Sequence, residues 1–295
     1  MKLYLSDRLN PYENIAFEKH LLDLKEEALF LWVNQPSVII GRNQNPYAEV
    51  DMEYLKENKI CLVRRYSGGG AVYHDQGNLN YSYISTEEST EEIINLIQKV
   101  LETKGIIVEK NGRNDLTVDG KKISGMAYLI ENEWVLHHGT CLVDLNEAVL
   151  CKVLKPSKIK LQSKGITSVK SRVLNLNQKN RELSSSNLIA SFCQVLNQEP
   201  ILPDWTDDII DQAKYLSSEE WIFAQSPDFT AQIEEKTVSG LFQVFIETKD
   251  NKIKAIKVYT DSLNPRFSDE NFNTFIGNDY NPENNDKIVE LIRLL

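Results

Sequence analysis

Two tight-turn signals divide residues 106–144 into adjacent β-type runs. Asp119-Gly120 is a preferred two-residue hairpin turn, and Glu131-Asn132-Glu133 marks a second turn further along the chain. The segment therefore predicts a β-meander, in which consecutive strands pair antiparallel. Hairpins of this kind, mixed with helices and without regular βαβ alternation, indicate an α+β fold.

Helices and further strands are predicted on both sides of the meander. Asn10 is a favourable N-cap for a helix that begins at Pro11, and an apolar stripe over Ile93–Leu101 predicts a helix that stops before Gly105. The pattern changes near residue 225, where another hairpin and a terminal helix follow. Strands are expected at Ala28–Val33, Ser37–Ile40, Ile60–Arg64, Leu79–Ile84, Leu241–Thr248 and Ile253–Thr260, and other helices at Met52–Glu57, Glu147–Leu154, Ser185–Leu196, Asp207–Leu216 and Asp286–Leu295.

Three consecutive glycines, Gly68–Gly70, give the strongest functional signal, in the segment RRYSGGGAVYHDQGNLNYSY over residues 64–83. Glycine tolerates positive φ and lets backbone N–H groups approach a ligand, and successive N–H groups form an anion-binding concavity. Arg64 and Arg65 stand beside the loop, and guanidinium groups suit carboxylates and phosphates. The segment therefore predicts a binding loop for a carboxylate or a phosphate.

Two familiar phosphate motifs are absent from this loop. A P-loop requires Lys followed by Ser or Thr after its last glycine, but Ala71-Val72 follows Gly70. A dinucleotide fingerprint requires a third glycine where Tyr73 stands. A nucleotide at this loop would therefore be bound in another architecture.

Lys122 is the second functional candidate, in the segment NGRNDLTVDGKKISGMAY over residues 111–128. It follows the Asp119-Gly120 turn directly, so a strand would hold it rigidly, and Gly125 lets another group come close. Such a lysine can stabilise charge that develops at an α-phosphate or a carboxylate. Lys121 and Lys122 could instead only keep a β-edge soluble, but the glycine loop in the same chain favours the functional interpretation.

Asn114 and Asp115 precede the lysine strand. They could orient a nucleotide or hold Mg²⁺, which takes one or two carboxylates together with substrate phosphates. The same pair is also common turn chemistry, so both interpretations stay open. His137-His138 does not predict a zinc site, because neighbouring strand residues point to opposite faces and no third ligand has suitable spacing. One of these histidines, like His74, is expected to act as a hydrogen-bonding group.

The composition limits the partners and the compartment. The chain of 295 residues has 33 basic and 43 acidic residues and a net charge of −10, which argues against general binding to nucleic acid or to an anionic membrane. It has no apolar run long enough to span a bilayer, and we expect no targeting signal at its start. Its four cysteines lack metal-type spacing, so we expect reduced thiols and a cytoplasmic protein.

Several segments, in order, resemble the lipoate–protein ligase family. They are RRYSGGGAVYHDQGNLNYS at 64–82, GRNDLTVDGKKISGMAY at 112–128, HHGT at 137–140 and KGITSVKSRV at 164–173, with NPYENIAFEKHLL near the start and VYTDSLNP at 258–265. The resemblance extends over nearly the whole chain. It implies a catalytic domain over residues 1–224, with the mixed β-sheet fold shared by biotin ligases and class II tRNA synthetases. It also implies a small C-terminal α/β accessory domain over residues 225–295.

The resemblance further implies a two-step reaction. Lipoate, or octanoate, reacts with ATP and Mg²⁺ to give an acyl adenylate and pyrophosphate, and the acyl group then passes to a lysine of an acceptor domain. The implied acceptors are E2 subunits of 2-oxoacid dehydrogenases and the glycine cleavage H protein, and we expect a monomer with no permanent metal. The implied nucleotide contacts are Arg65, Gly70, Ala71, Val72, Tyr73 and Lys122, and the implied lipoate contacts are Arg65, Ser67, Gly68, Gly69, His74, Lys122, Gly125 and His138, with Lys122 catalytic.

Two other functions stay open at this point. An octanoyl- or lipoyl-transferase of the same fold moves its acyl group through a Cys thioester without ATP, and such relatives carry that Cys before the lysine strand. Here that segment, Val108–Leu116, contains no cysteine, and no cysteine of the chain stands where the sequence would lower its thiol pKa. A non-catalytic lipoate-binding protein would not need Lys122 together with an intact glycine loop.

Overall fold

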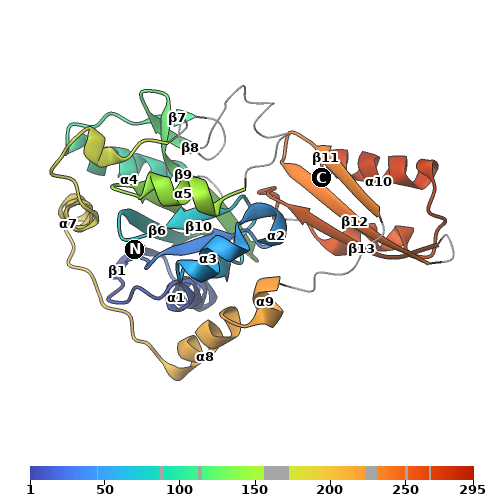
Figure 1. Ribbon diagram of the computed structural model, residues 1–295. Helices are drawn as coiled ribbons and strands as arrows, with labels where there is room; N and C mark the ends of the chain where they lie inside the picture. The colour runs from blue at the N-terminus through green and yellow to red at the C-terminus, as the bar shows by residue number, and fades with distance from the viewer. Residues whose placement is uncertain are drawn as a thin grey trace.

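A computed structural model describes residues 1–44, 46–86, 90–111, 115–155, 173–223, 231–249, 252–265 and 267–295. The chain forms a large α+β body and a smaller C-terminal body, which lie side by side in Figure 1. Its helices and strands confirm the predicted α+β class. Within the described ranges, no helix is long and apolar enough to cross a membrane.

The large body is built around a seven-stranded mixed sheet with the strand order β1-β2-β6-β10-β9-β8-β7. β1 pairs parallel with β2, and the other neighbours pair antiparallel. Asp119 and Asn132 adopt positive φ at the two predicted turns, so the predicted meander is confirmed. The strands are β1 (Lys2–Leu5), β2 (Ala28–Val33), β6 (Asn78–Ser85), β7 (Glu109–Asn111), β8 (Asp115–Val118), β9 (Lys121–Glu131) and β10 (Trp134–Leu142).

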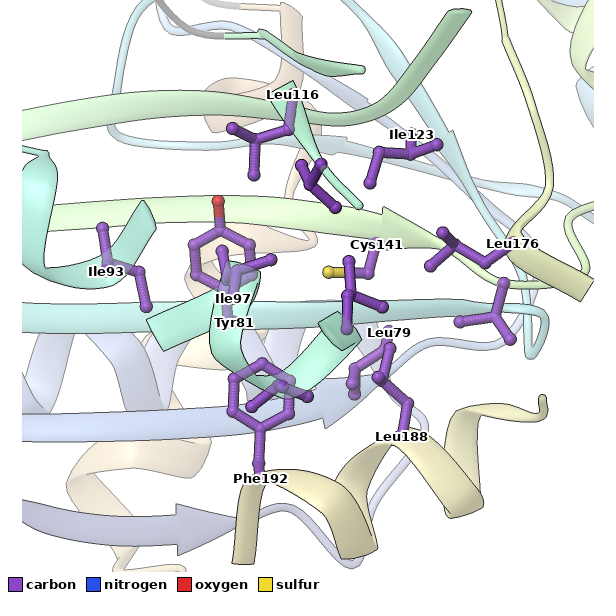
Figure 2. Close-up of a cluster of buried hydrophobic side chains, with 14 of the residues drawn as sticks. Leu79, Tyr81, Ile93, Ile97, Leu116, Ile123, Cys141, Leu176, Leu188 and Phe192 are labelled. Atoms are coloured by element: carbon purple, nitrogen blue, oxygen red, sulfur yellow. The ribbon is translucent and has the colours of Figure 1, made fainter. Parts of the chain in front are cut away.

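Helices cover both faces of this sheet. Successive β2 residues point to opposite faces, so that Leu31 joins the apolar cluster under α4 and α7 while Trp32 joins the cluster under α1 and α8. Figure 2 shows the first cluster, in which Ile97 of α4 and Phe192 of α7 lie beside Tyr81 of β6. The helices are α1 (Pro11–Leu24), α4 (Glu91–Glu102), α7 (Ser185–Leu196) and α8 (Asp207–Leu216), and the predicted apolar stripe of α4 is buried.

A second, three-stranded sheet carries the glycine segment. β3 (Ser37–Ile40) lies between β4 (Cys61–Arg64), parallel to it, and β5 (Val72–His74), antiparallel to it. The glycines join two strands that flank the same central strand, so the loop is held at both ends. The other described elements of the large body are α2 (Pro46–Glu49), α3 (Met52–Glu57), α5 (Glu147–Val153), α9 (Glu219–Phe223) and the 3-10 turn η2 (Leu176–Gln178).

The smaller body is a three-stranded antiparallel sheet packed against two helical segments. Its core includes Val244 of the sheet, Phe272 and Ile288. Its elements are β11 (Ala231–Lys236), β12 (Leu241–Lys249), β13 (Lys252–Thr260), the 3-10 helix η3 (Asp269–Phe275) and α10 (Pro282–Leu294), coloured orange to red in Figure 1.

The predicted elements are present, and the main differences have local causes. The sequence analysis does not predict β1 and β5, which have four and three residues and carry little periodic pattern, nor β11, whose AQIEEK sequence has few β-branched or aromatic residues. The expected start of the last helix at Asp286 is wrong, since α10 begins at Pro282. Asn281 caps it by accepting a hydrogen bond from the Asn284 N–H. The same Asn-Pro start predicts α1 correctly, where Asn10 accepts from the N–H of Tyr12.

Candidate active site

A cavity of about 550 Å³ opens between the large body and the C-terminal sheet. Its walls come from the glycine segment, the β9–β10 hairpin, α1 and β2 on one side and from the β11–β12 turn on the other. The predicted site residues that line it are Arg65, Gly69, Gly70, Ala71, Val72, His74, Asp115, Lys122, Gly125 and His138. Segments far apart in the sequence therefore meet at one cavity.

Three of the described predicted site residues do not line this cavity. Ser67 and Gly68 lie behind it and contact side chains that do line it. The Tyr73 side chain packs in the apolar cluster formed by the second sheet with α3 and α5, and this burial raises the pKa of its phenol. Asn114 lies outside the described residues.

Arg64 does not face an anion, contrary to the expectation for both arginines beside the glycines. It is 2% exposed. Its Nη1 donates to the carbonyl oxygens of Arg42 (2.7 Å) and Gln44 (2.8 Å), and its Nε donates to the carbonyl oxygen of Ile222 (2.9 Å). The guanidinium group therefore ties the segment before α2 and the end of α9 to β4, as a structural residue.

Arg65 holds the glycine loop in shape. Its Nε donates to Oγ of Ser67 (3.0 Å), and its Nη2 donates to the carbonyl oxygens of Gly68 (2.5 Å) and Gly70 (3.0 Å). The C=O and N–H groups of a trans peptide point in opposite directions, so the Gly69 N–H points away from Arg65. In this structure that N–H donates to the carbonyl oxygen of Ser262 (3.0 Å).

Lys122 reaches the cavity from β9. Its Nζ lies 2.8 Å from Oδ1 of Asp115 on the adjacent strand β8, and its carbonyl oxygen accepts from the Leu174 N–H (2.8 Å). A Cβ added at Gly125 would lie 2.6 Å from Nζ, so glycine leaves the space that the ammonium group occupies. The structure therefore confirms that the lysine is held on a strand beside a small residue.

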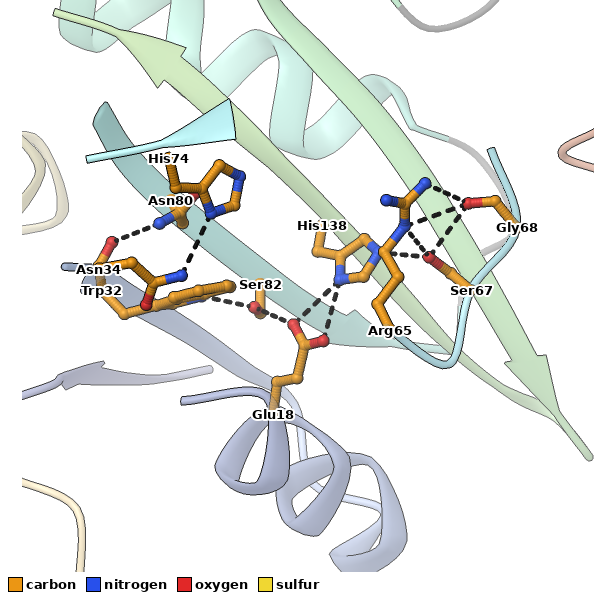
Figure 3. Close-up of polar contacts among 10 residues, drawn as sticks. All are labelled: Glu18, Trp32, Asn34, Arg65, Ser67, Gly68, His74, Asn80, Ser82 and His138. Atoms are coloured by element: carbon orange, nitrogen blue, oxygen red, sulfur yellow. Dashed lines mark hydrogen bonds and ion pairs between the residues drawn. The ribbon is translucent and has the colours of Figure 1, made fainter. Parts of the chain in front are cut away.

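A network of hydrogen-bonded, buried polar groups extends from α1 to the glycine loop (Figure 3). Both carboxylate oxygens of Glu18 lie 3.0 Å from Nδ1 of His138, and Nε2 of His138 lies 2.6 Å from Oγ of Ser67. Ser82 donates its hydroxyl to Glu18 (2.7 Å), and the Trp32 indole N–H donates to Ser82 (2.9 Å). The buried carboxylate is thus fully compensated by partners, and it orients the imidazole toward the loop.

His137 points away from this hydrogen-bonded network. Its ring lies beside those of Tyr83 and Tyr128, and it does not line the cavity. The prediction that only one of the two adjacent histidines faces the site is therefore confirmed, and the one that does is His138.

His74 is buried in the cavity wall. Its Nδ1 lies 3.2 Å from Nδ2 of Asn34, and its ring makes an edge contact with that of Trp32 at a centroid distance of 6.0 Å. Burial, and then the neighbouring Arg65 and His138, lower the pKa of His74 to about 3. The imidazole is therefore neutral at physiological pH.

The C-terminal body supplies a wall of the cavity that the sequence does not predict. Lys236 and the turn Thr237–Gly240 line it, and the turn is closed by a hydrogen bond from the Thr237 N–H to the Gly240 carbonyl (2.9 Å). Oδ1 of Asp261 accepts from the Leu241 N–H (2.7 Å), which fixes the turn to the segment that contacts Gly69. Lys236 is exposed, and it makes no ion pair or side-chain hydrogen bond within the described ranges.

Three further residues, which the sequence does not predict, line the cavity from α1, β2 and β6: Glu18, Trp32 and Asn80. The sequence pattern could have indicated Glu18 as a site residue, because Glu18 shares the apolar face of α1 with Ile15 and Leu22. An acidic residue on a buried helix face requires a partner, and that requirement points to a site.

The four cysteines, all of which are described, lie outside the residues that line the cavity. All four are free thiols. Cys141 is buried in the core, and this burial raises its thiol pKa to about 12. In the part of the chain that the structure describes, no three His, Cys, Asp or Glu side chains come together as a metal site.

Comparisons with known proteins give one consistent result. Residues 10–197 match the family model described as the lipoyl protein ligase A/B catalytic domain, and residues 226–294 match that of the bacterial lipoate protein ligase C-terminus. A lipoate-protein ligase A from Bdellovibrio bacteriovorus is 35% identical over 290 residues, which cover 90% of this chain and 84% of that protein.

Solved structures agree with these matches. LipL1 of P. falciparum in complex with lipoate is similar with a TM-score of 0.82 and 25% identity, over 100% of this chain and 99% of that one. A bipartite lipoate protein ligase with its E2 lipoyl domain, from Thermoplasma acidophilum, gives 0.63 and 28% over 78% and 98% of the two chains. A lipoate-protein ligase A bound with ATP gives 0.62 and 27% over 75% and 98%.

The fold is that of the lipoate protein ligases among these structures. The chain belongs to the lipoate-protein ligase family, as its sequence motifs predict.

Proposed function

We propose that the protein converts lipoate and ATP to lipoyl-AMP and pyrophosphate in this cavity. It then transfers the lipoyl group to a lysine of an acceptor domain. The observation that carries this proposal is the position of Lys122, whose ammonium group shares the cavity with the glycine loop and lies beside Asp115. A cation held there stabilises the negative charge that concentrates on the α-phosphate when a carboxylate attacks it. Family membership, and the relatives bound with lipoate or with ATP, support the same reaction.

We assign the apolar part of the cavity to the acyl chain. Ile15, Trp32, Ile39, Val72 and Met126 line it, and burying a hydrocarbon chain against such walls stabilises binding by about 0.8 kcal/mol per CH₂ group. The carboxyl end would then lie near Lys122, Gly125 and His74. Octanoate fits the same assignment, because it offers the same carboxyl group on an unbranched chain.

We assign the nucleotide to the glycine loop and the mouth of the cavity. Gly69–Val72 and Lys122 would contact it from the large body, and Lys236 would approach its phosphates from the C-terminal turn. Asp115 suits Mg²⁺, which takes one or two carboxylates and completes its shell with phosphate and water oxygens. When bound, Mg²⁺ would neutralise phosphate charge, while Lys122 acts at the reacting carboxyl group and α-phosphate.

The second step needs no protein nucleophile. The neutral ε-amine of an acceptor lysine attacks the acyl carbonyl of lipoyl-AMP, AMP leaves with the bonding electrons, and the nitrogen releases a proton to solvent as the amide forms. We propose lipoyl domains of E2 subunits and the glycine cleavage H protein as acceptors, and one relative forms part of a system with an E2 lipoyl domain. A single chain builds the cavity, which supports action as a monomer, and four free thiols support a cytoplasmic location.

We further propose that residues 1–224 carry the chemistry and that residues 225–295 form the accessory domain. The two family matches, at 10–197 and 226–294, support a boundary in this region.

Lipoylation of a purified lipoyl domain, followed by mass spectrometry, tests the proposed function. With lipoate and Mg²⁺, the added lipoyl mass should appear only when ATP is present, and a lipoyl domain with its acceptor lysine replaced by arginine should stay unmodified. An octanoyl thioester on a carrier protein, supplied without ATP, should give no transfer. Transfer from that thioester would instead favour the octanoyl- or lipoyl-transferase function.

A further inference from the structure

His74 lines the cavity, and one nitrogen of its ring has no hydrogen-bond partner among the described residues. The residue is 4% exposed. Its Nδ1 lies 3.2 Å from Nδ2 of Asn34, whereas its Nε2 is buried without a partner. Figure 3 shows that the contact from Asn34 reaches one nitrogen of the ring and leaves the other bare. Buried polar atoms are nearly always hydrogen-bonded, so Nε2 lacks a partner that an atom of a bound ligand would supply.

The side-chain amide of Asn14, on α1, has one possible orientation. Its Nδ2 lies 3.2 Å from the carbonyl oxygen of Arg8 and 3.3 Å from that of Val33. Carbonyl oxygens only accept hydrogen bonds, so the atom beside them is the NH₂ group. On the other side of the amide, Oδ1 accepts from the hydroxyl of Ser6 (2.6 Å). The Asn14 NH₂ group is therefore also the donor to Oδ1 of Asn34, at 3.0 Å.

The orientation of Asn14 fixes that of Asn34, and Asn34 in turn fixes the proton on His74. Because Oδ1 of Asn34 faces Asn14, its NH₂ group faces the imidazole and can only donate. Nδ1 of His74 must accept, so the single proton of the neutral ring lies on Nε2. A proton on Nδ1 would bring two donors together. Burial and the neighbouring Arg65 and His138 also disfavour the doubly protonated ring, since they lower its pKa to about 3.

We propose that Asn34 is a positioning residue, which holds His74 as an Nε2–H donor to an oxygen atom of the bound substrate. Asn34 does not line the cavity and acts through His74. The inference rests on the proposed function, because His74 lines the cavity in which the acid and the nucleotide would meet. The acceptor is a carboxyl oxygen of the acid or a phosphate oxygen of the nucleotide, and both accept from a neutral N–H.

Replacing Asn34 by aspartate reverses the hydrogen bond without a large change of shape. A carboxylate can only accept, so Asn34→Asp moves the proton of His74 to Nδ1 and leaves Nε2 as an acceptor. Acid restores a proton to Nε2, because the nearby carboxylate favours the doubly protonated ring. Among the described residues, Arg65 and His138 are the neighbours that lower the pKa of His74, and Glu18 is paired to His138.

Nitrogen-15 NMR of the histidine-labelled protein tests the proton position in the wild-type chain, with His74→Gln used to assign the signals. Nε2 of His74 should show the shift of a protonated ring nitrogen and Nδ1 that of an unprotonated one, unchanged between about pH 5 and pH 9. Lipoate, or a non-hydrolysable ATP analogue, should move the Nε2 signal, and the ligand that moves it supplies the acceptor oxygen. A proton on Nδ1, or an Nε2 signal that neither ligand moves, would overturn the proposal.

Calorimetric titration of variants tests the role of Asn34. At about pH 8, Asn34→Asp should bind the same ligand about tenfold more weakly than the wild type, and the affinity should recover as the pH falls. Asn58→Asp adds the same charge at an exposed amide and should leave the affinity unchanged. Equal affinities of Asn34→Asp and the wild type at high pH would overturn the proposal.

Misfolding of the variant, or failure of the proposed function, can be told apart from failure of the proposal for His74. If Asn34→Asp does not fold, the NMR experiment on the wild-type chain decides by itself. Lipoate-dependent ATP–pyrophosphate exchange by the wild type reports separately on the proposed function, so its absence would overturn that function and leave the proton position of His74 as measured.

Discussion

The Nζ atom of Lys122 lies 2.8 Å from Oδ1 of Asp115, so the lysine that we propose as catalytic is held by the strand next to its own. Both side chains are 33% exposed, and solvent weakens an ion pair at such a position. We expect a bound nucleotide phosphate to take the place of the carboxylate beside Nζ. Asp115 would then be free to bind Mg²⁺. Lys122 would thus bind the negative phosphate, and Asp115 would bind the positive metal ion.

Lys122→Ala should abolish activity and leave the fold intact. Loss of a preorganised charge at the reacting centre costs roughly 100-fold or more in rate, whereas a partly exposed strand lysine contributes little to stability. Single-turnover formation of lipoyl-AMP measures the effect. Lys121→Ala is the matched control, because this neighbouring lysine is exposed and does not line the cavity. Normal lipoyl-AMP formation by Lys122→Ala would remove the lysine from the mechanism.

Gly125→Ala should lower the rate of lipoyl-AMP formation while leaving the stability of the fold nearly unchanged. The added Cβ would lie 2.6 Å from Nζ of Lys122, and the flexible end of the lysine can move away at little cost to the fold. The ammonium group would then leave the reacting centre, and a displacement of about 1 Å can cost on the order of 100-fold in rate. Comparison of melting temperature and lipoyl-AMP formation checks this. A variant that melts normally and reacts at the wild-type rate would contradict the close approach.

The sequence predicts this part of the site well, because the information is local. The Asp119-Gly120 turn places Lys122 on a strand, and the alternation of strand residues leaves one of His137 and His138 for the cavity. The two arginines show the limit of such reasoning. Arg64 and Arg65 are neighbours of the same type, and their roles differ because the carbonyl partners of Arg64 come from residues 42, 44 and 222.

The wall from the C-terminal body is beyond prediction from one sequence. The Gly69 N–H meets the Ser262 carbonyl oxygen at 3.0 Å, and a Cβ at Gly68 would overlap that same oxygen. These contacts join segments that lie far apart along the chain, and no local pattern encodes them. Only the tertiary structure brings Lys236 to the cavity.

Lys236→Ala should weaken ATP binding without changing the use of preformed lipoyl-AMP. An exposed charge contributes modestly, so we expect the KM for ATP to rise about fivefold, with a smaller effect at high salt. Lys254→Ala, at an exposed position on the same sheet, is the control. If the two variants had the same KM for ATP, the C-terminal turn would not contact the phosphates.

Acid should destabilise the protein partly through His74. Its pKa is about 3 in the folded chain and about 6.5 in the unfolded chain, so the unfolded chain binds the proton more strongly. The stability that the neutral ring provides is complete above about pH 6.5 and is lost as the pH falls toward 3. Between pH 7 and pH 4.5, urea unfolding of the wild type should lose about 2–3 kcal/mol more than that of His74→Gln. Equal losses would show that His74 is not buried in its neutral form.

Lipoate-dependent ATP–pyrophosphate exchange tests the central claim, that an acyl adenylate forms in this cavity, most directly. The wild-type protein is incubated with ATP, Mg²⁺ and labelled pyrophosphate, without any acceptor domain. We predict that label enters ATP only when lipoate is present, that Lys121→Ala retains this exchange and that Lys122→Ala loses it. No exchange by a protein that still lipoylates its acceptor, or equal exchange without lipoate, would contradict the account.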